Sequence, residues 1–124
     1  MVNWKVDELE RIGSAEELRI ASLRGDGSLR KPVIVWSVRK GDDLYVRSVN
    51  GPGTSWFRGA QMLHQGHIQV GRTEKDVDFV DETDEKVNDE IDAEYRAKYS
   101  RYPSIVPSIV SAQARAATIK IVPR

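Results

Sequence analysis

Apolar side chains recur along this chain with two different periods, which separate the segments that form strands from those that form helices. Alternation with period two, or a short β-branched run, predicts a strand wherever glycine, proline or asparagine follows it. The six predicted strands cover residues 17–23, 33–38, 44–49, 67–72, 76–80 and 117–122. Short turns join most of them, so we expect an antiparallel sheet, and closure into a small barrel would remove its exposed edges.

A period of three to four residues predicts three helices, over residues 4–12, 55–63 and 84–99. In the first helix the apolar positions are Trp4, Leu9 and Ile12, and Gly13 is its predicted stop. The second has Thr54 or Ser55 as its cap, and Gly66 is its predicted stop.

The third helix is the most regular one in the sequence. Thr83 is its predicted cap, acidic residues fill its first turn and basic residues its last, as the helix dipole favours. Its apolar residues recur every fourth position, at Val87, Ile91, Tyr95 and Tyr99. Pro103 and Pro107 then predict a turn or short helix before the last strand. The predicted fold is therefore α+β: a six-stranded antiparallel barrel with a short helix after the third strand and a long helix before the last.

The composition fits one domain over residues 1–124, with 40% apolar and 31% charged residues. The chain has no cysteine, which excludes thiolate catalysis and sulfur-ligated metals and fits a reducing cytoplasm. No apolar run approaches the length of a membrane span, so we expect a soluble, cytoplasmic protein without a membrane partner.

The 19 basic and 19 acidic residues cancel, which argues against a nucleic-acid partner, but they are segregated along the chain. Residues 73–94 hold 2 Lys/Arg against 11 Asp/Glu, whereas residues 95–124 hold 6 Lys/Arg and no acid. We interpret the acidic block as a hairpin edge and a solvated helix face that neighbouring bases neutralise.

Histidine-dependent chemistry has little support, because the chain contains only His64 and His67. They span the predicted end of a helix and the start of a strand, with no third ligand nearby, so we expect a helix-end contact for His64 and a strand side chain for His67. We predict no metal site and name no catalytic residue.

The candidate site is the segment from Arg47 to Arg58. A strand ends in Arg47 and Ser48, a glycine-rich loop follows, and a helix begins near Ser55 with its unpaired N–H groups directed back toward the loop. Helix N-termini and guanidinium groups both favour phosphate, so we expect Arg47, Arg58 and these N–H groups to converge on one anion-binding pocket. The alternative is that Arg47 pairs with the acidic block and Ser55 only caps the helix.

Two tryptophans flank this segment. Trp36 lies in the middle of a predicted strand and Trp56 at the start of the short helix. A planar heterocycle could stack on either ring, although aromatic rings more often serve as core packing.

Four segments together carry a resemblance to a known family: residues 44–58, 25–33, 67–70 and 118–123. The chain resembles an uncharacterised bacterial family related to the flavin and deazaflavin split-barrel superfamily, which includes pyridoxamine-phosphate-oxidase-like proteins and deazaflavin-dependent nitroreductases. The similarity spans roughly residues 15–123, although residues 63–66 lack the Asn-Pro that often precedes the next strand in the superfamily.

The resemblance implies a six-stranded split barrel, usually a homodimer, that holds the phosphate of FMN or a deazaflavin at the end of one strand. The implied cofactor-binding residues are Arg47, Ser48, Ser55 and Arg58, with Trp56 against the ligand and Arg30 or Lys31 as further phosphate contacts. The expected function is a flavin- or deazaflavin-binding oxidoreductase acting on a small molecule. The alternative is a non-catalytic split-barrel binding or scaffold module that has lost its cofactor.

Overall fold

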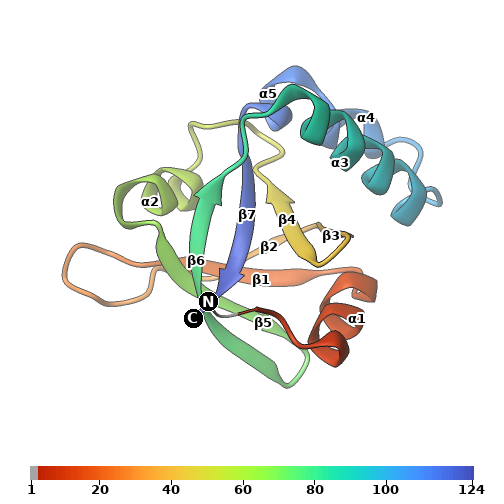
Figure 1. Ribbon diagram of the computed structural model, residues 1–124. Helices are drawn as coiled ribbons and strands as arrows, with labels where there is room; N and C mark the ends of the chain where they lie inside the picture. The colour runs from red at the N-terminus through yellow and green to blue at the C-terminus, as the bar shows by residue number, and fades with distance from the viewer. Residues whose placement is uncertain (1–2) are drawn as a thin grey trace.

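The alternating segments of the sequence form strands that join one antiparallel sheet. In the computed structural model, which describes residues 3–124, the sheet has seven strands (Figure 1). They are β1 (Leu18–Ser22), β2 (Val33–Val35), β3 (Ser37–Lys40), β4 (Asp43–Arg47), β5 (Gln65–Val70), β6 (Thr73–Asp81) and β7 (Thr118–Pro123). Their order across the sheet is β2-β1-β5-β6-β7-β4-β3.

The sheet curls into a nearly closed barrel because the predicted strand over residues 33–38 serves both of its edges. The structure divides that strand at Trp36: β2 pairs with β1 at one edge, and β3 pairs with β4 at the other. Since one residue separates β2 from β3, the chain itself links the two edges. The predicted α+β antiparallel split-barrel class is confirmed, and the strand count is seven rather than six because this strand bends.

Five helices accompany the sheet in the described part of the chain. They are α1 (Val6–Ser14), α2 (Ser55–Leu63), α3 (Glu85–Lys98), α4 (Val106–Ile109) and α5 (Ala112–Arg115). The predicted span of α2, residues 55–63, is confirmed. In Figure 1, α3, α4 and α5 lie together at one end of the barrel, and α1 and α2 lie apart from them.

Several predicted element ends are wrong. Helix α1 begins at Val6, after Trp4, and contains Gly13 instead of stopping there. The cap of α3 is Asp84 rather than Thr83, because the Asp84 carboxylate accepts hydrogen bonds from two N–H groups of the first turn.

The second hairpin is longer than its sequence pattern predicts. Helix α2 ends at His64, which takes a left-handed conformation with φ 55°, so that Gly66 belongs to β5 instead of ending the helix. The turn between β5 and β6 falls at residues 71–72, where Gly71 has φ 58°, and residues 73–75 are part of β6.

Strand β4 is buried on both faces, and this burial determines where the side chains of the candidate site point. Leu44 and Val46 lie in the barrel core, whereas Tyr45 lies in a second apolar cluster with residues of α3. Because side chains alternate along a strand, Arg47 points to the same side as Tyr45, toward α3.

The segregated charges of the sequence pair across the fold. Lys40 contacts Glu90 at 2.9 Å, and Arg115 contacts Asp89 at 2.9 Å. These contacts confirm the prediction that basic neighbours neutralise the acidic face of α3. Within residues 3–124, none of the helices combines the length and apolarity needed to cross a membrane.

Substitution of Gly66 tests the packing of the barrel. A methyl group at Gly66 would lie 2.2 Å from the Ala21 carbonyl oxygen and 2.7 Å from the Phe79 ring. We expect Gly66→Ala to lower the free energy of unfolding by at least about 2 kcal/mol in urea denaturation, because neither neighbour can move away easily. In the matched control Gly25→Ala the new methyl group meets no atom within 4 Å, so its effect stays within about 0.5 kcal/mol. Equal stability of the two variants would contradict this packing.

Candidate functional site

The N-terminus of α2 lacks the side-chain cap that its sequence suggests. Thr54 is the N-cap residue, but its hydroxyl is hydrogen bonded to the Ser48 hydroxyl at 2.8 Å and makes no cap hydrogen bond. Within the described residues, the backbone N–H groups of Ser55, Trp56 and Phe57 have no hydrogen-bond acceptor. The first turn of α2 therefore presents three free donors and the positive end of its dipole.

Ser55 and Trp56, which carry two of these donors, line a cleft of about 540 Å³ between the β2–β3 bend and α2, which we call the tryptophan cleft. Its apolar walls come from Val33, Val35, Trp36, Trp56, Ile105 and Ile109. Its polar part comes from Ser48, Thr54 and Ser55, together with Asn50. A mostly apolar cleft with polar groups gathered at one place is the usual form of a small-molecule site.

Trp36 is half-buried and held rigidly at the bend between β2 and β3. Its ring stacks on the Tyr99 ring with centroids 4.0 Å apart and planes 1° from parallel. The Tyr95 hydroxyl donates a hydrogen bond to the Trp36 carbonyl oxygen at 2.7 Å. Burial raises the pKa of Tyr95 well above its ordinary value, so this hydroxyl keeps its proton and remains a donor.

Trp56, which also lines the cleft, is 9% exposed and belongs to the barrel core, where its ring meets Phe57 edge to face at 5.8 Å. Each tryptophan thus packs against the protein and also lines the cleft, and stacking of a planar ligand on either ring stays a prediction.

Arg47 is fully engaged by protein groups. Its Nε donates to the Thr118 hydroxyl at 2.9 Å, and Nη1 donates to the Asp92 carboxylate and the Ile109 carbonyl. Nη2 donates to the backbone and side-chain oxygens of Asn88. All five N–H groups of the guanidinium are thereby used, and its side chain is 0% exposed. No donor of Arg47 remains for a ligand.

Asp92 links Arg47 to a second arginine. One carboxylate oxygen of Asp92 accepts from Arg47 and the other accepts from Arg115 at 2.7 Å. Arg115 also contacts Asp89, on the exposed side of α3. This network, which we call the Arg47 network, ties β4, α3, α4 and β7 together.

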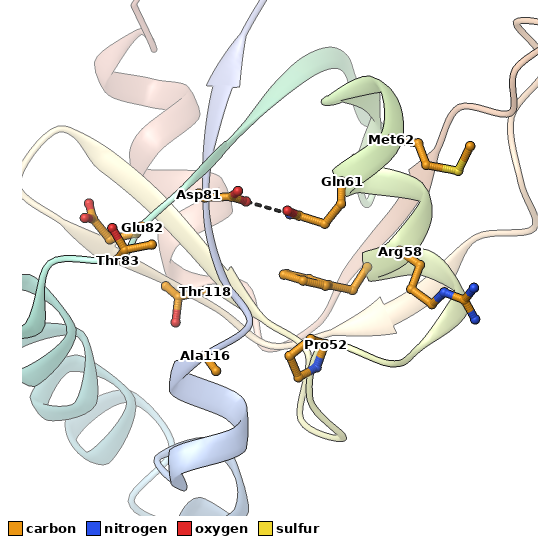
Figure 2. Close-up of a pocket in the computed structure, with 10 residues that line it drawn as sticks. Pro52, Arg58, Gln61, Met62, Asp81, Glu82, Thr83, Ala116 and Thr118 are labelled. Atoms are coloured by element: carbon orange, nitrogen blue, oxygen red, sulfur yellow. Dashed lines mark hydrogen bonds between the residues drawn. The ribbon is translucent and has the colours of Figure 1, made fainter.

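Arg58 lies at a different cleft, of about 500 Å³, on the other side of α2 (Figure 2). The cleft is lined by the carboxylates of Asp81 and Glu82, and Gln61 donates to Asp81 at 2.6 Å. In Figure 2 the Arg58 side chain points away from Asp81 and Thr118. A phosphate in this cleft would face two carboxylates, so Arg58 does not create an anion site here.

The remaining predicted cations stand apart from the tryptophan cleft. Lys31 is exposed and lines neither of the two clefts. The side chain of Arg30 passes close to Gly59 of α2, where a methyl group on Gly59 would come 2.5 Å from Arg30 Nε.

The structure thus brings together four of the six predicted site residues: Arg47, Ser48, Ser55 and Trp56 line one cleft. The expected convergence of the Arg47 and Arg58 guanidiniums on one pocket is wrong. Arg47 is bonded inside the protein, whereas Arg58 lines the cleft of Figure 2. The alternative for Arg47, pairing with the acidic block, is what the structure shows. A cofactor-binding role for Ser48, Ser55 and Trp56 stays a prediction.

Both histidines occupy the structural places predicted for them. His64 ends α2, and the ring nitrogens of His67 bond to Asp76 at 3.0 Å and Glu74 at 2.9 Å across the hairpin. Burial alone would lower the pKa of His67, but the two carboxylates outweigh it and raise the pKa. Within residues 3–124, no group of three or more His, Asp or Glu side chains is arranged to hold a metal ion.

Sequence reasoning missed the residues that surround Arg47 and complete the cleft. Asn88 and Asp92 stand four residues apart on α3, next to Ile91 and Tyr95 of the apolar stripe. This spacing is the signal that could have predicted their place on the buried face of the helix. No comparable signal marked Ile109, because its segment has neither a strand nor a long helix pattern.

A nearly closed antiparallel barrel with a long helix packed on β3 and β4 defines the chain as a split-barrel protein, and solved structures share this fold. A conserved hypothetical protein of Mycobacterium tuberculosis superposes with a TM-score of 0.69 at 11% identity, covering 100% of this chain and 82% of that one. HutZ, described as the heme storage protein of Vibrio cholerae, gives a TM-score of 0.70 at 13% identity, covering 100% of this chain and 92% of HutZ. ChuZ of Campylobacter jejuni gives a TM-score of 0.72 at 12% identity, covering 93% of this chain and 50% of ChuZ.

Over residues 8–121 the chain matches a family described as an uncharacterized protein conserved in bacteria (DUF2255), and it belongs to that family. The resemblance to an uncharacterised bacterial split-barrel family is thereby confirmed. No curated protein matches the chain in sequence. At identities this low, the solved structures establish the fold alone.

Substitution of Asp92 tests the Arg47 network. We expect Asp92→Asn to lower the free energy of unfolding by about 3–5 kcal/mol, because the buried Arg47 loses its counterion. The control is Asp89→Asn, whose exposed carboxylate contacts the same Arg115 and which should cost about 1 kcal/mol or less. Chemical denaturation measures both, and an Asp92→Asn cost no larger than that of the control would contradict the network.

Proposed function

We propose that the tryptophan cleft binds a planar, phosphate-bearing cofactor of the flavin or deazaflavin type, which serves an oxidoreductase reaction on a small molecule. One observation carries the proposal: the uncapped N-terminus of α2 opens on a cleft whose walls include two tryptophans. A volume of about 540 Å³ lies within the range of cofactor sites.

The phosphate position follows from the free donors of α2. Because Ser48 holds the Thr54 hydroxyl, no side chain competes for the N–H groups of Ser55 and Trp56, the two residues of the first turn that line the cleft. Backbone N–H groups at the start of a helix bind phosphate without any cationic side chain, and the dipole of a nine-residue helix adds to the attraction. The Ser55 hydroxyl, exposed at the same place, supplies a further donor.

The ring system of the cofactor would lie along the apolar walls of the cleft. When bound, such a cofactor supplies the hydride chemistry of the reaction. The walls at Val33, Trp36 and Trp56 would orient the ring and exclude water from one of its faces. The stacking of Trp36 on Tyr99 fixes that wall in advance, which lowers the ordering cost of binding.

Heme is a less suitable occupant of this cleft, although HutZ shares the fold. Heme iron in proteins is held by an axial side chain such as histidine, cysteine, methionine or tyrosine. The described residues that line the cleft include none of these. His67, moreover, is engaged by two carboxylates on the hairpin.

A non-catalytic binding or scaffold module is the second candidate, and the burial of Arg47 favours it. Among the described residues that line the tryptophan cleft, Arg47 is the one cation, and the protein uses all of its donors. A module of this kind would keep the Arg47 network for stability and bind no flavin.

The homodimer implied by the resemblance stays a prediction. Two exposed apolar side chains, Ile34 at 54% and Ile105 at 44%, stand at the rim of the tryptophan cleft and support an interface there. Light scattering of the purified chain should give twice the mass of 14.0 kDa. A monomeric mass at high micromolar concentration would contradict the proposed interface.

A comparison of FMN with riboflavin tests the cofactor proposal, because the two differ only in the phosphate. We expect FMN, or a phosphate-bearing deazaflavin, to bind about tenfold more tightly than its phosphate-free form in fluorescence titration. Ser55→Pro removes one N–H group at a position where proline is compatible with the helix, since Thr54 already has φ −71° and ψ 153°. This variant should weaken FMN binding severalfold and leave riboflavin binding unchanged.

The matched control is Ser55→Ala, which retains the N–H group and should lose less FMN affinity than Ser55→Pro. If Ser55→Pro weakened FMN and riboflavin equally, the phosphate would lie elsewhere. If neither flavin nor deazaflavin bound at millimolar concentration, the non-catalytic module would replace the proposal.

A further inference from the structure

The amine of Lys98 is held in an unusual setting at the end of α3. Its Nζ donates a hydrogen bond to the Ser37 carbonyl oxygen at 2.6 Å and lies 5.1 Å from the centre of the Tyr99 ring. Within residues 3–124, no carboxylate comes within ion-pair distance of this amine. The direct contacts of the cation are therefore a carbonyl dipole and an aromatic face.

The charged groups around Lys98 are occupied elsewhere. Glu16 is bonded by Tyr102 and Arg101, and the Arg39 Nε donates to the Gly41 carbonyl. Glu94 lines the same cavity without contacting the amine at ion-pair distance. Burial consequently lowers the pKa of Lys98 to about 8, and the charge of Glu16 opposes this only in part.

Lys98 also has free space beside it. A cavity of about 320 Å³ lies where α1, β3 and α3 meet, lined by Gly13, Val38, Arg39, Glu94, Ala97 and Lys98. Because Lys98 lines this cavity, an acetyl group on its amine would have space beside it.

We propose that Lys98 is a site of acylation by small acyl phosphates. The neutral amine attacks the acyl carbon, a C–N bond forms, the C–O bond to phosphate breaks, and the amine proton leaves with the phosphate as hydrogen phosphate. The cavity receives the acyl group.

The product retains what holds Lys98 in place. An N-acyl lysine keeps one N–H group, which can still donate to the Ser37 carbonyl oxygen. Acylation removes a half-buried charge that has no carboxylate partner, so it replaces a costly group with a neutral one. Acylation of Lys40, by contrast, would remove a charge that has a partner, because Lys40 contacts Glu90.

Competition among the lysines of the native, full-length chain tests this proposal. The protein is treated with acetyl phosphate at pH 7.5 and at pH 10.5, and peptide mass spectrometry gives the initial rate at each lysine. Lys31 and Lys86 serve as exposed controls. At pH 7.5 about a quarter of the Lys98 amine is neutral, against about a thousandth of an ordinary lysine.

We expect Lys98 to react at least tenfold faster than Lys31 and Lys86 at pH 7.5, and no faster than either at pH 10.5, where all three are substantially neutral. Lys98→Arg should abolish the fast reaction and leave the rates at Lys31 and Lys86 unchanged. A rate at Lys98 that is equal to or below those of the controls at pH 7.5, or a rate ratio that does not change with pH, would overturn the proposal.

Discussion

The buried ion pair between Arg47 and Asp92 is the constraint on which the rest of this structure depends. Burying a guanidinium is costly unless every donor finds a partner, and here β7, α3 and α4 each supply acceptors to one side chain on β4. The pair therefore fixes α3 and the segment after it against the barrel. Ile109, whose carbonyl accepts from Arg47, forms part of the wall of the tryptophan cleft.

This use of Arg47 decides the chemistry available to the cleft. The guanidinium beside the loop is neutralised internally, so an anion in the cleft meets backbone N–H groups at the start of α2 instead of a free cation. Ser48 contributes indirectly, since it holds the Thr54 hydroxyl away from those groups. A site built on backbone donors depends on the shape of the loop, and Gly51, with φ 88°, permits the turn that this loop requires.

Much of the fold could be predicted because local patterns governed it. The bounds of α2 and the apolar stripe of α3 followed from spacing alone, and Ile91, Tyr95 and Tyr99 are buried as that stripe requires. The division of one strand at Trp36 could not be predicted, because it results from barrel closure, which joins residues far apart in the sequence. Pairing with the acidic block was one of the alternatives for Arg47, but the particular partner could not be predicted, because 45 residues separate Arg47 from Asp92.

The most direct measurement of where an anion binds is an amide and guanidinium NMR titration of the protein with FMN. If the phosphate binds at the start of α2, the backbone N–H resonances of Ser55 and Trp56 shift most, while the Arg47 Nε–H resonance remains protected from exchange and does not move. Large shifts at the Arg47 Nε–H, or shifts confined to the cleft around Arg58, would contradict it.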